Sequence, residues 1–217
     1  MSRGHRLALL VTGASGMALP RHLLAAMARR HDVERVHLVV SRGASQVLKH
    51  ELGASSTGAA DLVAASGIAD VDTDGDGDGD GSVDGAAAKI EIHKDSAIDA
   101  PIASGSHRLT GTAVVPLSAG TLGAFATGSA RTLVHRAGAV ALKEGWPFVL
   151  GFRETPLSVV HLENLRRLAY QGAVILPPIP AFYIDDPSME RFLDHYAMRV
   201  LDGLGLPASR DADLRWS

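Results

Sequence analysis

The sequence ALKEGWPFVLGFRETP, residues 141–156, contains a short apolar run that charged residues follow directly. An apolar run like the one at 148–152 is typical of a strand that is covered on both faces of a sheet. Lys143 precedes this run, and Arg153 and Glu154 come immediately after it. Polar groups at the carboxyl end of such a strand lie where open α/β sheets bind ligands. We therefore expect an ammonium, a guanidinium and a carboxylate to meet at one point, with the cations binding an anion and the carboxylate transferring a proton.

Similar apolar runs alternate with helical patterns along the chain. Strands are predicted at 5–12, 36–40, 89–93, 112–116, 148–152 and 173–176, and helices at 19–31, 42–52, 129–143, 161–171 and from about 187 onward. This alternation predicts an α/β fold with a doubly wound, mostly parallel sheet, a flavodoxin- or Rossmann-like three-layer sandwich.

The bulk composition limits the class of protein. The 217 residues suit one domain over the whole chain, 1–217, with 46% hydrophobic and 21% charged residues and a formal net charge of −3. This charge balance does not favour bulk nucleic-acid or membrane binding. The absence of cysteine excludes disulfides, a thiolate nucleophile and a thiolate metal site. Because no apolar run approaches the length of a membrane span, we expect a cytoplasmic protein.

Residues 54–88 form a segment in which the alternation is lost and alanine, glycine, serine and aspartate dominate. Its core, DTDGDGDGDG at 72–81, is similar to the start of a calcium loop. The twelfth position of that register is Val83 and not the glutamate that such loops require. We therefore expect a flexible surface insertion, without a bound metal.

Two strand-to-turn junctions carry glycines and hydroxyls. GASG at 13–16 separates the first predicted strand from a helix, and PLSAGT at 116–121 follows a later strand. A tight glycine turn between strand and helix offers backbone N–H groups and a positive helix end to a phosphate. One such turn is weak evidence, but two of them favour a phosphate-bearing cofactor.

Four polar residues have two interpretations each on spacing alone. Ser41 suits a helix N-cap, with or without a ligand contact. Arg136 lies beside the apolar stripe of its helix, where it either reaches an anion or stays exposed. Glu51 lies in the last turn of a helix, where an acid is mildly unfavourable, so another partner is expected. Arg199 lies off the apolar stripe of the last helix, which is typical of a surface charge.

Seven segments carry a family resemblance, together with a closing Arg215–Trp216. They are TGASG at 12–16, VVSRGA at 39–44, ASGS at 103–106, PLSAGTL at 116–122, HRAGAVALKE at 135–144, RETPLSVVHLENL at 153–165 and GAVILPPIPAFY at 172–183. In order and spacing the chain resembles the flavin prenyltransferases of the UbiX family, outside the Asp-Gly insertion. The resemblance implies a homododecameric, flavodoxin-like enzyme that joins a dimethylallyl group from dimethylallyl phosphate to N5 and C6 of reduced FMN. The product, prenylated FMN, would serve a UbiD-type decarboxylase.

The resemblance also implies roles for individual residues. FMN would be bound by Gly13, Ala14, Ser15, Ser41, Ser118, Ala119, Gly120, Thr121 and Arg136. The substrate phosphate would be bound by Ser104, Lys143, Arg153, Tyr183 and Arg199. Glu154 would transfer protons near N5, with Ser15, Glu51 and Lys143 as further catalytic residues. Clustered cations would stabilise the negative charge that develops on the leaving phosphate, so no metal is required.

Three alternatives stay open on the sequence. An FMN-dependent cysteine decarboxylase of the phosphopantothenoylcysteine type shares the fold, but such enzymes carry an asparagine-containing PxMN segment near the position of PPIPAFY here. An NAD(P)-linked short-chain dehydrogenase requires a third glycine after Gly16 and a Tyr-x-x-x-Lys pair, and neither Tyr170 nor Tyr196 has a lysine four residues on. A non-enzymatic flavin carrier would not require a proton-transferring residue such as Glu154.

Overall fold

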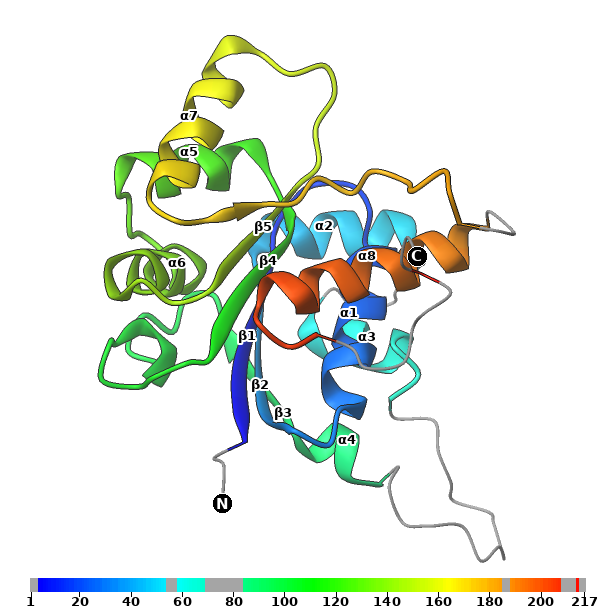
Figure 1. Ribbon diagram of the computed structural model, residues 1–217. Helices are drawn as coiled ribbons and strands as arrows, with labels where there is room; N and C mark the ends of the chain where they lie inside the picture. The colour runs from blue at the N-terminus through cyan, green and yellow to red at the C-terminus, as the bar shows by residue number, and fades with distance from the viewer. Residues whose placement is uncertain (1–3, 54–57, 69–83, 185–187, 208–213, 215–217) are drawn as a thin grey trace, which may run out of the picture.

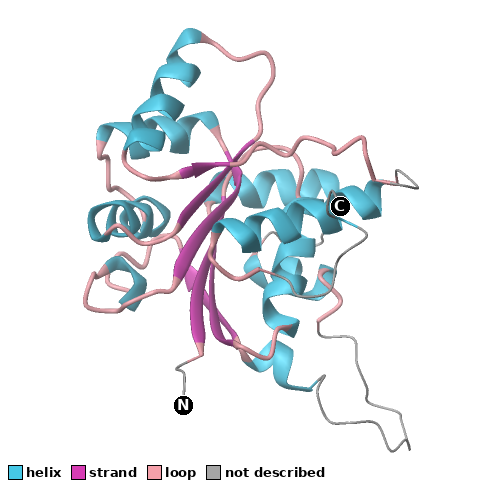
Figure 2. Ribbon diagram, in the orientation of Figure 1, coloured by secondary structure: helices cyan, strands magenta, loops and turns pink. Residues whose placement is uncertain are grey.

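The computed structural model describes residues 4–53, 58–68, 84–184, 188–207 and 214, and the statements below concern these residues. Six parallel strands form one sheet in the order β3-β2-β1-β4-β5-β6, which Figure 2 shows between two layers of helices. They are β1 (His5–Val11), β2 (Val33–Val40), β3 (Ile90–Lys94), β4 (Gly111–Leu117), β5 (Phe148–Phe152) and β6 (Val174–Ile175). The predicted doubly wound α/β fold is confirmed.

Helices cover both faces of the sheet (Figure 1). One face carries α1 (Ala18–Arg29), α2 (Arg42–Glu51), α3 (Ala59–Ala65) and α8 (Met189–Gly203). The other carries η1 (Pro101–Ala103), α5 (Ala119–Thr127), α6 (Leu133–Glu144) and α7 (Val159–Tyr170). Among the described residues, no helix has the length and apolar character that a membrane crossing requires.

Strand β1 shows how the sequence produces two separate cores. Successive strand residues point to opposite faces, and β1 is apolar at every position from Leu7 to Val11. Leu7 and Leu9 therefore pack in the core under α1 and α8, whereas Ala8 and Leu10 pack in the core under α6. A central strand of a parallel sheet is buried on both faces in this way.

Helix α5 was not predicted, because the sequence AGTLGAFAT resembles a turn in its content of small residues. It begins after Ser118, whose hydroxyl accepts a hydrogen bond from Thr121 N, and it ends at Gly128 in the left-handed conformation. Helix α6 begins at Leu133 and not at residue 129, because the Thr132 side chain caps it by accepting from His135 N.

The segment at 54–88 differs in part from the expected loose chain. It contains α3 and the short α4 (Asp84–Ala88), and each buries an apolar residue, Leu62 and Ala86 respectively. The prediction of an irregular insertion is therefore wrong for these two helices. The Asp-Gly run itself lies outside the described residues.

Candidate functional site

The ends of β1 and β4 are joined by one threonine side chain. Thr12 Oγ1 donates a hydrogen bond to Pro116 O and accepts one from Ser118 N, both at 2.7 Å. The two glycine- and hydroxyl-containing turns therefore lie side by side at the carboxyl edge of the sheet. Sequence analysis did not single out Thr12, although a hydroxyl directly before a glycine turn was available as a signal.

The turn after β1 packs closely against the start of α2. A Cβ atom added at Gly13 would lie 2.9 Å from the carbonyl carbon of Gly43, which is closer than real Cβ atoms approach. Gly16 has φ of +108°, a value that side chains disfavour. Ser41 caps α2 by accepting from Ala44 N at 3.2 Å. Glycine is therefore required at residue 13, because a side chain there would collide with the backbone of Gly43.

Glu51 folds back onto the same turn and has the second partner that its helix position suggested. Its carboxylate accepts hydrogen bonds from Gly16 N at 3.0 Å and from Met17 N at 2.7 Å. Arg153 Nε donates to Ser15 O at 3.1 Å. Burial raises the pKa of the Glu51 carboxyl. The hydrogen bonds from Met17, Ser15 and Gly16 and the charge of Arg153 together lower it by more, so the net pKa lies below its ordinary value. Ser15, Glu51 and Arg153 are thereby brought together in one chain.

Arg136 lies in the first turn of α6, which starts at the carboxyl edge of the sheet. Its Nε is buried and has no hydrogen-bond partner among the described residues. Leaving such a donor unpaired costs on the order of 1–3 kcal/mol, so a ligand oxygen would stabilise the protein here. A Cβ atom at Gly120, in the first turn of α5, would meet nothing within 4 Å. The unpaired cation and the open helix start fit a cofactor phosphate.

Glu154 is exposed at the end of β5, directly after Arg153. Its Oε1 accepts a hydrogen bond from Thr155 N at 3.0 Å, which holds the carboxylate beside its own backbone. A carboxylate at this edge is placed to exchange protons with a ligand that binds over the glycine turns.

A second group of predicted residues lies on and before α8. Tyr183 Oη is 3.2 Å from His195 Nε2, and Arg199 Nη1 donates to Asp202 Oδ2 at 3.4 Å. His195 and Arg199 are four residues apart, so they lie on one side of α8. The sequence analysis did not single out His195, and no motif would have found it.

Lys143 and Ser104 form a third group at the opposite edge of the sheet. Lys143 lies in the last turn of α6 and pairs with Glu144, and a Cβ atom at Gly105 would be 3.0 Å from Lys143 Nζ. The five residues of β5 span about 16 Å, from the edge where the strand begins to the edge where Arg153 follows it. The prediction that Lys143 meets Arg153 and Glu154 is therefore wrong within one chain. Helix α6 precedes β5 and ends at the edge where the strands begin, the amino edge, whereas Arg153 and Glu154 follow β5 at the carboxyl edge.

Comparisons with known proteins show what the whole chain is similar to. The family model described as flavoprotein matches residues 1–194. The flavin prenyltransferase UbiX of Pseudomonas aeruginosa is 37% identical over 216 residues, which cover 100% of this chain and 96% of that protein. The solved dodecameric FMN-dependent UbiX-like decarboxylase from Escherichia coli O157:H7 has a TM-score of 0.78 and 34% identity, covering 98% of this chain and 99% of that one. AnUbiX (PadA1), solved in complex with FMN and dimethylallyl pyrophosphate, has a TM-score of 0.76 and 35% identity, covering 99% and 98%.

Proposed function

The chain belongs to the flavoprotein family and, within it, to the flavin prenyltransferases of the UbiX type, and from this premise we propose its reaction. It transfers the dimethylallyl group of dimethylallyl phosphate to N5 and C6 of reduced FMN and releases prenylated FMN. The observation that carries the proposal is the pair of glycine turns that Thr12 joins at the carboxyl edge. A phosphate-bearing flavin requires such a concentration of backbone donors and helix starts.

The residues of that edge would bind FMN. The turn of Gly13, Ala14 and Ser15 and the start of α5 from Ser118 to Thr121 would surround the flavin phosphate. Arg136 would add a half-buried guanidinium whose buried Nε has no partner among the described residues. Ser41 adds a hydroxyl at the start of α2.

Reduced flavin supplies the nucleophilic atoms when it is bound. Glu154 would accept a proton from the flavin near N5. Arg153 would bind a phosphate oxygen with its planar guanidinium. Glu51 and Ser15 hold the turn in shape, because the Glu51 carboxylate binds the N–H groups of Gly16 and Met17. Cations around the leaving phosphate would stabilise the charge that develops as the allylic C–O bond breaks.

The remaining phosphate-binding residues would come from neighbouring copies of the chain. Lys143 is 60% exposed and lies at the other edge of the sheet from Arg153. Val159 and Phe182 are 71% and 92% exposed, and exposed apolar side chains of this kind mark interaction surfaces. The related structure from Escherichia coli O157:H7 is dodecameric. We therefore expect a homododecamer in which Ser104, Lys143, Tyr183 and Arg199 complete the site of another copy.

The proposal extends to the surroundings of the reaction. Transfer would not require a metal ion, since the cations named above supply the charge that stabilises the leaving group. The product would pass to a UbiD-type decarboxylase in the cytoplasm.

Anaerobic incubation of the purified protein with reduced FMN and dimethylallyl phosphate tests the proposal. Mass analysis of the flavin should show the addition of one C5H8 unit, with and without EDTA. Dimethylallyl pyrophosphate, the ligand seen with AnUbiX, serves as the parallel substrate. Bound but unmodified flavin with both substrates would contradict the proposal and indicate a flavin carrier.

A further inference from the structure

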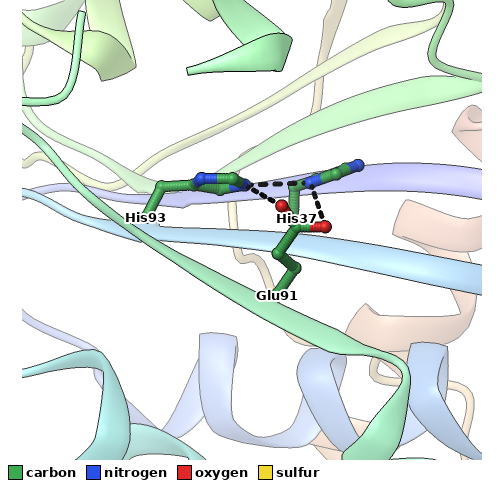
Figure 3. A group of neighbouring side chains, drawn as sticks. All are labelled: His37, Glu91 and His93. Atoms are coloured by element: carbon green, nitrogen blue, oxygen red, sulfur yellow. Dashed lines mark hydrogen bonds and ion pairs between the residues drawn. The ribbon is translucent and has the colours of Figure 1, made fainter. Parts of the chain in front are cut away.

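Three side chains outside the proposed transfer site gather on one face of the sheet, on its outermost strand β3 and the neighbouring β2 (Figure 3). His37 lies on β2, and Glu91 and His93 lie on the neighbouring edge strand β3. His37 pairs in register with Glu91, and Val39 pairs with His93. Because alternate strand residues share a face, all three side chains point to the same side.

The spacing of their polar atoms suits a metal ion. His37 Nδ1 and His93 Nε2 are 3.0 Å apart, and the nearest Glu91 oxygens lie 3.6 Å and 3.5 Å from them, respectively. Tetrahedral zinc with bonds of 2.0–2.2 Å holds neighbouring ligand atoms roughly 3.3–3.5 Å apart. We propose that His37, Glu91 and His93 bind one Zn²⁺ ion, with a solvent molecule as the fourth ligand.

The surroundings prepare the two imidazoles for this role. The His37 side chain is buried, with 2% of its surface exposed, and both ring nitrogens face other side chains of the cluster. Glu91 is 41% exposed, so the ion can enter from solvent on that side.

His107 contacts the His37 ring and is not one of the three proposed ligands. Its Nε2 lies 3.3 Å from Nε2 of His37, the ring nitrogen that faces away from Glu91. When His37 Nε2 donates a hydrogen bond to His107 Nε2, the proton of the His37 ring lies on Nε2 and Nδ1 is free for the metal. Ligating histidines are commonly oriented by a hydrogen bond that their second ring nitrogen donates, and here His107 would accept it.

The alternative to a metal ion is direct hydrogen bonding between the imidazole rings. The three imidazoles lie in a row and can form a hydrogen-bonded chain from His93 through His37 to His107. Such a chain leaves the Glu91 carboxylate without a role toward the two rings, although it lies within 3.6 Å of both. A cation at the centre of the three side chains uses all of them, and it also neutralises the carboxylate.

The site would be structural. Strand β3 has five residues and, within the described part of the chain, pairs with β2 and no other strand. Two ligands from β3 and one from β2 would therefore hold this edge strand to the sheet. His37 lies four residues before Ser41, so the ion would also brace the strand that leads to the flavin-binding turns.

Zinc titration of the full chain without an affinity tag tests the proposal. After EDTA treatment and its removal, Zn²⁺ is titrated against a chromophoric chelator in excess Mg²⁺ and Ca²⁺, which occupy weak carboxylate sites. We expect one Zn²⁺ per chain and, at 100 times Kd, a rise in Tm of about 5–10 °C. Co²⁺ should give the visible absorption of a tetrahedral site.

Matched variants locate the ion. His93→Asn should weaken Zn²⁺ binding by more than about 100-fold, and His107→Ala should weaken it by about 10–100-fold. His50→Ala, at an exposed histidine of α2, should bind Zn²⁺ as the parent does. Glu91→Gln, at a half-exposed position, serves as the ligand variant if His93→Asn does not fold.

The proposal is overturned if the parent takes up no stoichiometric Zn²⁺, or if His93→Asn and Glu91→Gln bind it as tightly as the parent. Either result would assign the cluster to a hydrogen-bonded imidazole chain.

Discussion

The two edges of the sheet differ in how their functional residues are held. At the carboxyl edge, Thr12 joins two turns, Glu51 binds the backbone of one of them, and Arg153 contacts Ser15. At the amino edge, Lys143 is exposed and pairs with its neighbour Glu144. Under the proposed function, one chain would preorganise the flavin half of the site, whereas the phosphate half would depend on assembly.

The largest effect is expected for Glu154→Gln at the carboxyl edge. Loss of a positioned proton acceptor should lower turnover by about 10²–10⁴-fold. FMN affinity should stay unchanged, because the Glu154 carboxylate is exposed and hydrogen-bonds to the neighbouring Thr155 N, not to the glycine turns. Glu163→Gln on α7 is the control. Single-turnover rates and flavin titrations measure the two quantities, and unchanged turnover in Glu154→Gln would remove this residue from the mechanism.

Gly13→Ala should disturb the carboxyl edge through packing. The new Cβ would lie 2.9 Å from the backbone of Gly43, and overpacking of this kind costs about 1–3 kcal/mol. FMN binding should weaken with it. Gly123→Ala in α5, where a Cβ meets nothing within 4 Å, should keep or raise stability. Equal stability of the two variants in thermal unfolding would contradict the close packing of the turn.

Thr12→Val tests whether the two hydrogen bonds of Thr12 Oγ1, and not only the burial of its side chain, stabilise the carboxyl edge. It leaves Ser118 N without its partner, which should lower the free energy of unfolding by about 1–3 kcal/mol. Thr112 is equally buried, but its hydroxyl has no partner in the described structure, so Thr112→Val should be neutral or stabilising. Denaturant unfolding compares the pair, and a larger loss at residue 112 would argue against the bridge.

Arg199→Ala should have a smaller effect that falls on the substrate. If Arg199 binds the substrate phosphate as proposed, its loss should raise the apparent KM for dimethylallyl phosphate by about 10-fold and leave FMN affinity unchanged. Arg191→Ala at the start of α8 provides the control. An unaltered KM would show that α8 does not reach the site.

The sequence predicted the elements whose signal is local. The apolar runs of β1 and β5 identify strands buried on both faces, and the hydroxyl before α2 identifies its N-cap. The family resemblance, carried by seven segments, is confirmed by the comparisons.

The sequence did not predict features that depend on chain direction or long-range contact, nor the helices within a segment of low sequence complexity. The ammonium of Lys143 is ten residues from Arg153 in sequence, but the strand between them places the two at opposite edges. Thr12 and Ser118 are 106 residues apart, so no local pattern reports their bond. The helices α3 and α4 were hidden by a composition of alanine and glycine.

Mixed assemblies test most directly whether the two edges of different copies form one site. Lys143→Met and Arg153→Met should each be inactive alone. When the two variants are dissociated and reassembled together, about a quarter of the sites receive both native residues, because each is drawn independently from a neighbouring copy. The account predicts that prenylated FMN then appears at about that fraction of the parent's rate, and mixed assemblies as inactive as the separate variants would contradict it.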